Sequence, residues 1–133
     1  MVTVRTAKSK GSSFEYDCQE SLAAIYPDIY RTSERGFQLQ YDLEANTAVF
    51  ECKRLAGISW NQAIKFMKKL QDKAPCDKKT FLLFKSNRQP CLVMVAQDVS
   101  TSLYKIEYMY HITTFESVFG IPFVKHASTR KRK

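Results

Sequence analysis

Two carboxylates and a lysine are spaced in this chain so that a β-hairpin would bring them together. Asp42 and Glu51 stand at either end of a segment with a turn-forming centre at residues 44–47 and strand-forming residues beside it. A hairpin here places the two acids side by side, and Lys53, two residues after Glu51, points to the same face of the strand. Two acids and an amine on one side of a sheet can hold a divalent metal and activate a water beside it.

The composition indicates one folded domain with a basic surface. The chain has 133 residues, 44% of them hydrophobic, and a formal net charge of +8. We therefore expect a single core and polyanionic partners, with nucleic acid the usual one. The sequence has no apolar run of about 20 residues and no apolar signal region at its start, so we expect no membrane span, no secretion and an intracellular location. Its four scattered cysteines predict free thiols, not a zinc site.

A first helix is expected before the hairpin. Ser12 or Ser13 can cap its N-terminus, and apolar residues follow at helical spacing as far as Ile25. Pro27 ends the helix. Glu15 lies next to the apolar face of this helix, not opposite it.

A second helix is expected after the hairpin. Ser59-Trp-Asn-Gln62 is a capping box, and an apolar stripe continues from it to Leu70. The helix lies between the strand that ends at Lys53 and an apolar run, which suggests a strand–helix–strand crossover. Further elements expected are strands at 81–84, 91–95 and 105–111 and a short helix from Thr113 that Gly120 ends.

The chain is expected to form one domain with basic ends. We predict a flexible basic arm at residues 1–11, a single domain at 12–124 and a basic tail at 125–133. The tail contains the run Arg-Lys-Arg-Lys, which would add non-specific attraction for phosphates.

These features resemble the PD-(D/E)XK nuclease superfamily, and within it the small archaeal-type Holliday junction resolvases. The segment Lys10–Glu15 looks like the family's basic stretch that leads into a glutamate-bearing helix, and Glu51-Cys52-Lys53 matches its E-x-K tripeptide. Tyr41-Asp42 stands in place of the Pro-Asp pair, so the chain departs from the pattern at Tyr41. A true Pro-Asp occurs at residues 27–28, which we interpret as a decoy. The match covers roughly residues 8–96.

The resemblance implies an α/β, restriction-endonuclease-like αβββαβ core, with a mixed central sheet flanked by helices. It also implies an endonuclease that uses Mg²⁺ or Mn²⁺, acts on branched DNA as a homodimer, and needs no small-molecule cofactor and no membrane. Asp42, Glu51 and the Cys52 backbone carbonyl would hold the metal, and Glu15 could reach the same cluster. Lys53 would orient or deprotonate a water, and Ser33 would help to position the junction. Phosphate contacts are expected from Lys8, Lys10, Arg31, Arg35, Arg54, Gln62 and Lys65.

Other interpretations stay open at this point. Another PD-(D/E)XK nuclease, such as a nickase or a restriction-like or RecB-like enzyme, would look similar. A non-catalytic basic DNA-binding module would also explain the charge. In that case the two acids and Lys53 would form a surface ion-pair ladder, Ser33 would be a turn residue and Gln62 only a helix cap.

Overall fold

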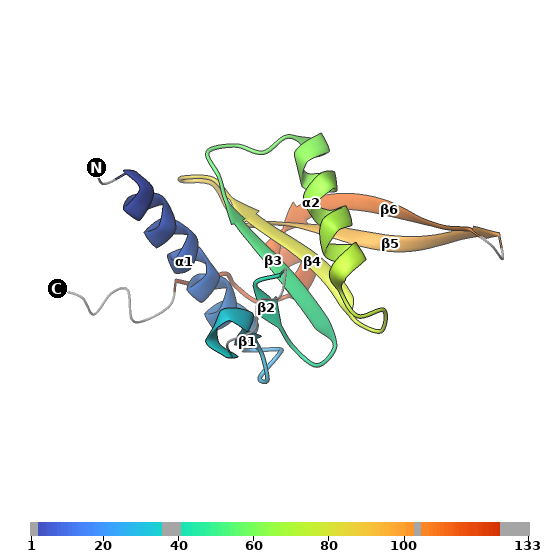
Figure 1. Cartoon of the computed structure of the whole chain (residues 1–133), viewed down its shortest axis with the longest axis horizontal. Helices are drawn as coiled ribbons and strands as arrows, with labels where there is room; N and C mark the ends of the chain where they lie inside the picture. The colour runs from blue at the N-terminus through green and yellow to red at the C-terminus, as the bar shows by residue number, and fades with distance from the viewer. Residues whose placement is uncertain (1–2, 36–40, 103–104, 126–133) are drawn as a thin grey trace.

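The chain folds as an α/β structure in which helices cover both faces of a mixed sheet (Figure 1). The computed structural model describes residues 3–35, 41–102 and 105–125. Within these ranges the six strands lie side by side in chain order: β1 (Tyr30–Arg31), β2 (Leu43–Glu44), β3 (Ala48–Arg54), β4 (Lys79–Lys85), β5 (Leu92–Ser102) and β6 (Lys105–Thr114). The helices are α1 (Thr3–Leu22), α2 (Trp60–Lys73), α3 (Phe115–Phe119) and the 3₁₀ helix η1 (Thr32–Arg35). The expected class, a mixed sheet flanked by helices, is confirmed. No helix in the described ranges is long and apolar enough to span a membrane.

Helix α1 begins and ends earlier than the sequence predicted. It runs from Thr3 to Leu22, so residues 3–11, which were expected to precede the helix as a basic arm, are helical. Gly11 costs only about 1 kcal/mol inside a helix, and extending a helix that is already anchored adds one hydrogen bond per residue. At the other end, Ile25 lies outside the helix and is 41% exposed.

The predicted hairpin and crossover are both present at the centre of the sheet. β2 and β3 pair antiparallel with Leu43 opposite Phe50, and the Ala45 N–H donates to the Ala48 carbonyl across the turn. The strand–helix–strand order then makes β4 parallel to β3, the one parallel pair among the described strands. Helix α2 connects these two strands and begins at the predicted capping box.

Each face of the sheet has its own core. On one face, α1 and α3 pack with Phe50 and Cys52 of β3, and Phe14, Phe50 and Phe115 are fully buried there. On the other face, α2 packs its buried residues Ala63, Met67 and Leu70 against Val49, Leu82 and Met94. Alternation along β3 therefore sends Glu51 and Lys53, like Val49, to the α2 face.

The C-terminal part differs from expectation in its boundaries. β5 and β6 are longer than predicted and extend well beyond the rest of the sheet (Figure 1). The short helix is capped by Thr114, not Thr113, because the Thr114 hydroxyl accepts the Ser117 N–H, and it ends at Gly120 with φ 72° as expected. Val124 is tied to α1 by hydrogen bonds to Ser21. Residues 126–133, most of the predicted tail, lie outside the described ranges.

Candidate active site

The hairpin brings Asp42 and Glu51 to the same end of the β2–β3 pair. Continuing the register of Leu43 with Phe50 places Asp42 opposite Glu51. The Asp42 N–H donates to the Phe50 carbonyl at 3.0 Å, and the Asp42 carboxylate accepts the Cys52 N–H at 2.8 Å. Asp42 is also fixed from the start of η1, since its carbonyl accepts the Thr32 N–H at 3.0 Å.

The two acids and Lys53 line one hollow with residues of α2. Lys53 Nζ lies 3.1 Å from Glu51 Oε2 and 4.7 Å from the ring centroid of Phe66. The hollow has a volume of about 310 Å³, and its lining comprises Tyr41, Asp42, Glu51, Lys53, Phe66, Lys69, Leu70 and Lys73. Acids from the hairpin therefore face lysines from the helix.

The Asp42 carboxyl is difficult to ionise in this position. Burial, followed by the negative charges of Glu51 and Glu15, raises its pKa from 3.8 to about 7. The Cys52 N–H and the charge of Lys53 act in the opposite direction, but they do not compensate. A carboxyl with a raised pKa beside a second acid is typical of catalytic sites and of cation sites that lack their cation.

Glu51 is affected in the same direction but is better compensated. Burial raises its pKa, whereas Lys53 lowers it by charge and hydrogen bonding; the charge of Glu15 raises it and that of Lys73 lowers it. Asp42, whose pKa is raised to about 7, is therefore able to hold a proton near neutral pH.

Glu15 approaches the pair but is held by Arg31. Its Oε1 accepts hydrogen bonds from Arg31 Nε at 3.2 Å and Arg31 Nη2 at 2.9 Å. The Arg31 guanidinium also lies 4.2 Å from the ring centroid of Tyr16, and its Nη1 lies 3.9 Å from Glu34 Oε2. Glu15 thus contributes negative charge to Asp42 and Glu51, but it does not line the hollow.

The donor set at the hairpin fits a hard divalent cation that keeps several waters. Carboxylate oxygens of Asp42 and Glu51 are ligands that Mg²⁺ prefers. The N–H and C=O of a strand residue point to the same side, so the Cys52 carbonyl faces the strand edge where Asp42 lies. Among the described residues, no three Cys, His, Asp or Glu side chains are grouped as a metal site. The protein could therefore supply two carboxylates and one backbone carbonyl as ligands.

The remaining predicted residues are more scattered. Ser33 lies exposed in η1, Lys65 is exposed on α2, and Arg54 donates to Asn87 at 2.8 Å. Gln62 completes the capping box with Ser59, which accounts for its side chain. The Lys8, Lys10 and Arg35 side chains are not described, although the backbones of Lys8 and Lys10 lie in α1 and that of Arg35 in η1.

The true Pro-Asp pair does not contribute to the site. Asp28 accepts the Asn46 N–H, so it holds the hairpin turn at the end away from Asp42. Sequence reasoning missed Tyr41, Phe66, Lys69 and Lys73 as lining residues. The spacing of the helix residues could have indicated them. Lys69 and Lys73 are four apart on α2 and Phe66 is three before Lys69, so the three side chains lie on one face of the helix.

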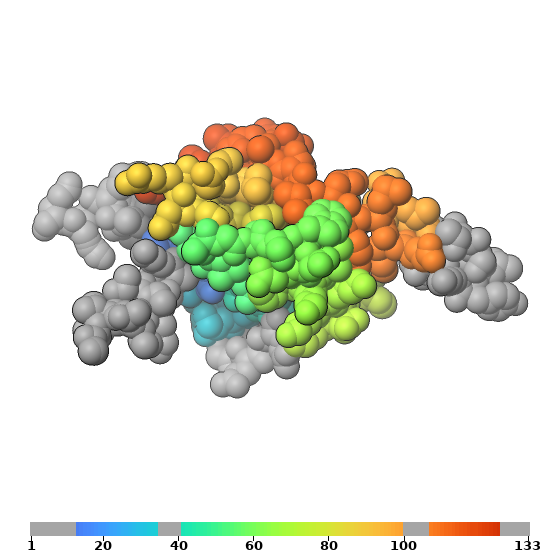
Figure 2. Space-filling view, turned by 90° about the horizontal axis from the view of Figure 1, so that it is seen from above, coloured from blue at the N-terminus to red at the C-terminus, as the bar shows by residue number. Residues whose placement is uncertain are grey.

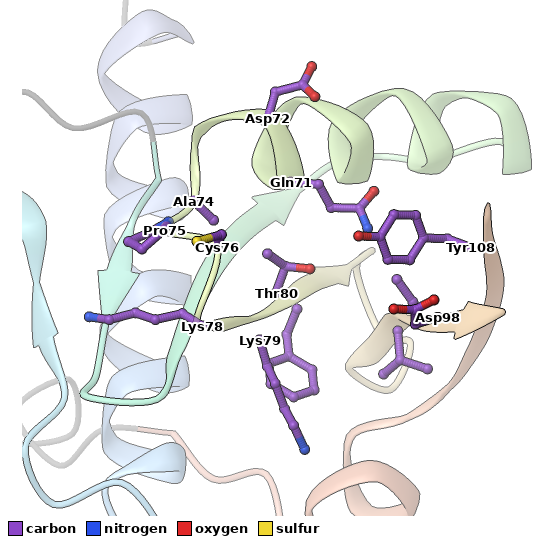
Figure 3. A pocket seen from close by; sticks show the side chains of 13 residues that line it. Gln71, Asp72, Ala74, Pro75, Cys76, Lys78, Lys79, Thr80, Asp98 and Tyr108 are labelled. Carbon is purple, nitrogen blue, oxygen red and sulfur yellow. The ribbon is translucent and has the colours of Figure 1, made fainter. Parts of the chain in front are cut away.

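A larger hollow of the described chain lies elsewhere. It measures about 700 Å³ and lies between the end of α2, the start of β4 and the β5–β6 hairpin, where Asp72, Lys79, Asp98 and Tyr108 surround it (Figure 3). It contains neither carboxylate of the hairpin. We assign the chemistry to the smaller hollow because convergent acids, a lysine and a raised pKa occur there together.

Three of the four cysteines meet in the core behind the site, which the sequence did not predict. Cys18, Cys52 and Cys91 are buried, and Cys18 interacts with both of the others. Burial raises the pKa of the Cys18 thiol and raises that of Cys52 to about 11. All three are free thiols as expected, and the raised pKa values of Cys18 and Cys52 make these two unreactive packing groups.

No protein-family model, no curated protein and no solved structure matches this chain.

Proposed function

We propose that this chain is a metal-dependent endonuclease for branched DNA, with the Holliday junction as its substrate and a homodimer as its active form. One observation carries the proposal: Asp42, Glu51 and Lys53 line a single hollow, where crowding raises the pKa of Asp42 to about 7. An ion-pair ladder on an open surface would leave its carboxyls with depressed pKa values. Here both acids are shifted upward, as expected where a cation is to bind.

Each residue of the hollow has a role in this reaction. Asp42 and Glu51, with the Cys52 carbonyl, would hold Mg²⁺ or Mn²⁺, which when bound lowers the pKa of a coordinated water and offsets phosphate charge. Lys53, 3.1 Å from Glu51, would orient the attacking water and stabilise negative charge as it develops on the phosphate. Lys69 and Lys73 would hold the neighbouring phosphates.

The order of elements supports the same proposal. One helix, three strands, a helix and a strand follow one another from α1 to β4, as in the αβββαβ core of restriction-endonuclease-like nucleases. Asp42 directly precedes the second strand and Glu51 lies in the third, which is where the resembled family carries its acids. The formal net charge of +8 suits a nucleic-acid substrate, and a two-fold dimer would match the near two-fold symmetry of a four-way junction.

The test is cleavage of a labelled immobile four-way junction in the presence of excess unlabelled linear duplex. We expect paired, symmetric nicks that require Mg²⁺ or Mn²⁺, and no nicks from Glu51→Gln, which keeps the shape of the side chain. Asp98→Asn is the matched control because Asp98 is exposed and outside the site. Both variants should bind the junction as the unaltered chain does.

Other results would redirect or refute the proposal. Metal-dependent cutting of the duplex competitor would keep the nuclease and reject the junction as its substrate. Tight, salt-sensitive binding without any product in either metal would reject catalysis and favour a DNA-binding module.

A further inference from the structure

Another hollow, which we call the outer hollow, lies on α2 next to the candidate active site. It has a volume of about 320 Å³ and mostly apolar walls, and its lining is Gln62, Lys65, Phe66, Lys68 and Lys69. Figure 2 shows the α2 segment, in green, at the centre of one face of the molecule. Pockets for small organic groups begin at roughly 300 Å³, so the hollow is of a size to hold one aromatic base.

The two hollows are neighbours. Phe66 and Lys69 line both of them, and the Phe66 ring carries Lys53 Nζ at 4.7 Å. A group in the outer hollow would therefore be separated from the acids only by the Phe66 and Lys69 side chains. A nucleotide whose base occupied it would have its phosphate close to Glu51.

The chemistry of this hollow matches a nucleotide. Lysine side chains expose apolar stems below a charged end, so apolar walls with ammonium groups at the rim result from Lys65, Lys68 and Lys69 around Phe66. A base stacks on such an aromatic wall while its flanking phosphates pair with the lysines. An apolar peptide would use the walls but not the charges, so charge complementarity favours DNA.

We propose that this hollow binds one unpaired base of the DNA strand, beside the phosphate that the site cleaves. The inference rests on the proposed function, since it names the feature of branched DNA that the protein recognises. A fully paired duplex offers no free base, whereas a bulge does, and the base pairs at a branch point open more readily than those inside a continuous duplex. The protein would then select branched DNA by one unpaired nucleotide as well as by the overall shape of the junction.

Binding without metal tests this separately from cleavage. Three labelled DNAs are titrated in EDTA: a perfect duplex, the same duplex with one bulged thymidine, and the same duplex with one bulged abasic nucleotide. The two bulged DNAs differ in composition only by the one base. Stacking is worth about 1–3 kcal/mol per base, so we expect the thymidine bulge to bind about ten-fold more tightly than the abasic bulge.

The variants locate the effect. Phe66→Leu should remove most of the preference for the thymidine bulge, and Phe66→Met replaces it if the leucine variant fails to fold by circular dichroism. Trp60→Ala should keep the preference, because Trp60 is an exposed aromatic residue on the same helix, six positions and about 120° away from Phe66. Equal affinity for both bulges, or a preference that survives in the Phe66 variants, would overturn the proposal.

The two proposals fail in different ways. If the preference for the base is found but Mg²⁺ yields no nicks in any DNA, the base site stands and the nuclease is rejected. If nicks form but the two bulges bind alike, the nuclease stands and the base site is rejected.

Discussion

Asp42→Asn should stabilise the folded protein at alkaline pH while it abolishes metal-dependent cleavage. In the folded chain, burial and the charges of Glu51 and Glu15 raise the pKa of Asp42 from 3.8 to about 7. In the unfolded chain the same carboxyl has its ordinary pKa. The folded state therefore binds one proton more than the unfolded state between these two values, and its stability falls as pH rises through that window.

The magnitude follows from the width of the window. From pH 5 to the folded-state pKa of about 7 the unaltered protein should lose about 1.4 kcal/mol per pH unit, or about 3 kcal/mol as an upper limit. The curve flattens about one pH unit above the folded-state pKa, where the loss is complete. Asparagine has no such titration, and its amide oxygen can still accept the Cys52 N–H that Asp42 accepts at 2.8 Å. The free energy of unfolding of Asp42→Asn, relative to that of the unaltered protein, should therefore increase by about 2–3 kcal/mol between pH 5 and pH 8.5.

Urea unfolding at several pH values measures this difference. With a slope of about 2 kcal/mol per molar urea for a small domain, the midpoint of Asp42→Asn should rise relative to the unaltered protein by about 1 M between pH 5 and 8.5. Asp98→Asn, which removes an exposed acid, is the control and should change little with pH. Mg²⁺ at pH 8.5 should raise the midpoint of the unaltered protein and leave that of Asp42→Asn unchanged, since only a folded site that binds the cation is stabilised.

The reasoning is refuted if the advantage of Asp42→Asn is the same at both pH values. It is refuted equally if the variant is the less stable protein at pH 8.5. Either result would mean that Asp42 is not crowded by negative charge in the folded chain, and the main support for a cation site would be lost.

Three further changes test how the site and its surroundings are held. Arg31→Met should destabilise the fold by about 2 kcal/mol, because it leaves Glu15 without its partner beside Asp42; urea unfolding checks this, and Glu15→Gln in the same chain should restore part of the loss. Ser59→Ala should cost about 1 kcal/mol by removing the α2 cap, whereas Ser59→Asp should cost much less, as thermal unfolding would show. Arg88→Gly should gain about 1 kcal/mol in urea unfolding, because Arg88 has φ 62° in the β4–β5 turn, where a side chain is strained.

The local part of the site could be predicted from the sequence. A turn between two strand-forming segments fixes its own register, so the pairing of Asp42 with Glu51 needed only the hairpin. The same holds for α2, whose start is set by the capping box at Ser59. In both cases the determining contacts join residues that are close along the chain.

The predictions that failed depended on contacts between distant segments or on weak local signals. The sequence could not show that Glu15 is held away from the hollow, because its partner Arg31 is 16 residues away and no sequence pattern pairs the two. The start of α1 was misplaced because Ser12 and Ser13 looked like caps, although a helix already anchored by Phe14 can extend through Gly11. Helix boundaries of this kind are set by packing as much as by local propensity.

The packing around the acids explains why their crowding persists. On one side of the sheet, Phe50 and Cys52 hold β3 in the core, and on the other Val49 is fully buried under α2. β3 cannot move away from β2 without opening both cores, so Glu51 stays near Asp42 even though each raises the free energy of the other's charged form. The fold thus maintains an electrostatic strain that proton binding relieves at low pH, and that a divalent cation would relieve at neutral pH. If that is its purpose, variants that relax the strain, such as Asp42→Asn, should be the more stable and the less active proteins, which is the trade-off expected of an active site.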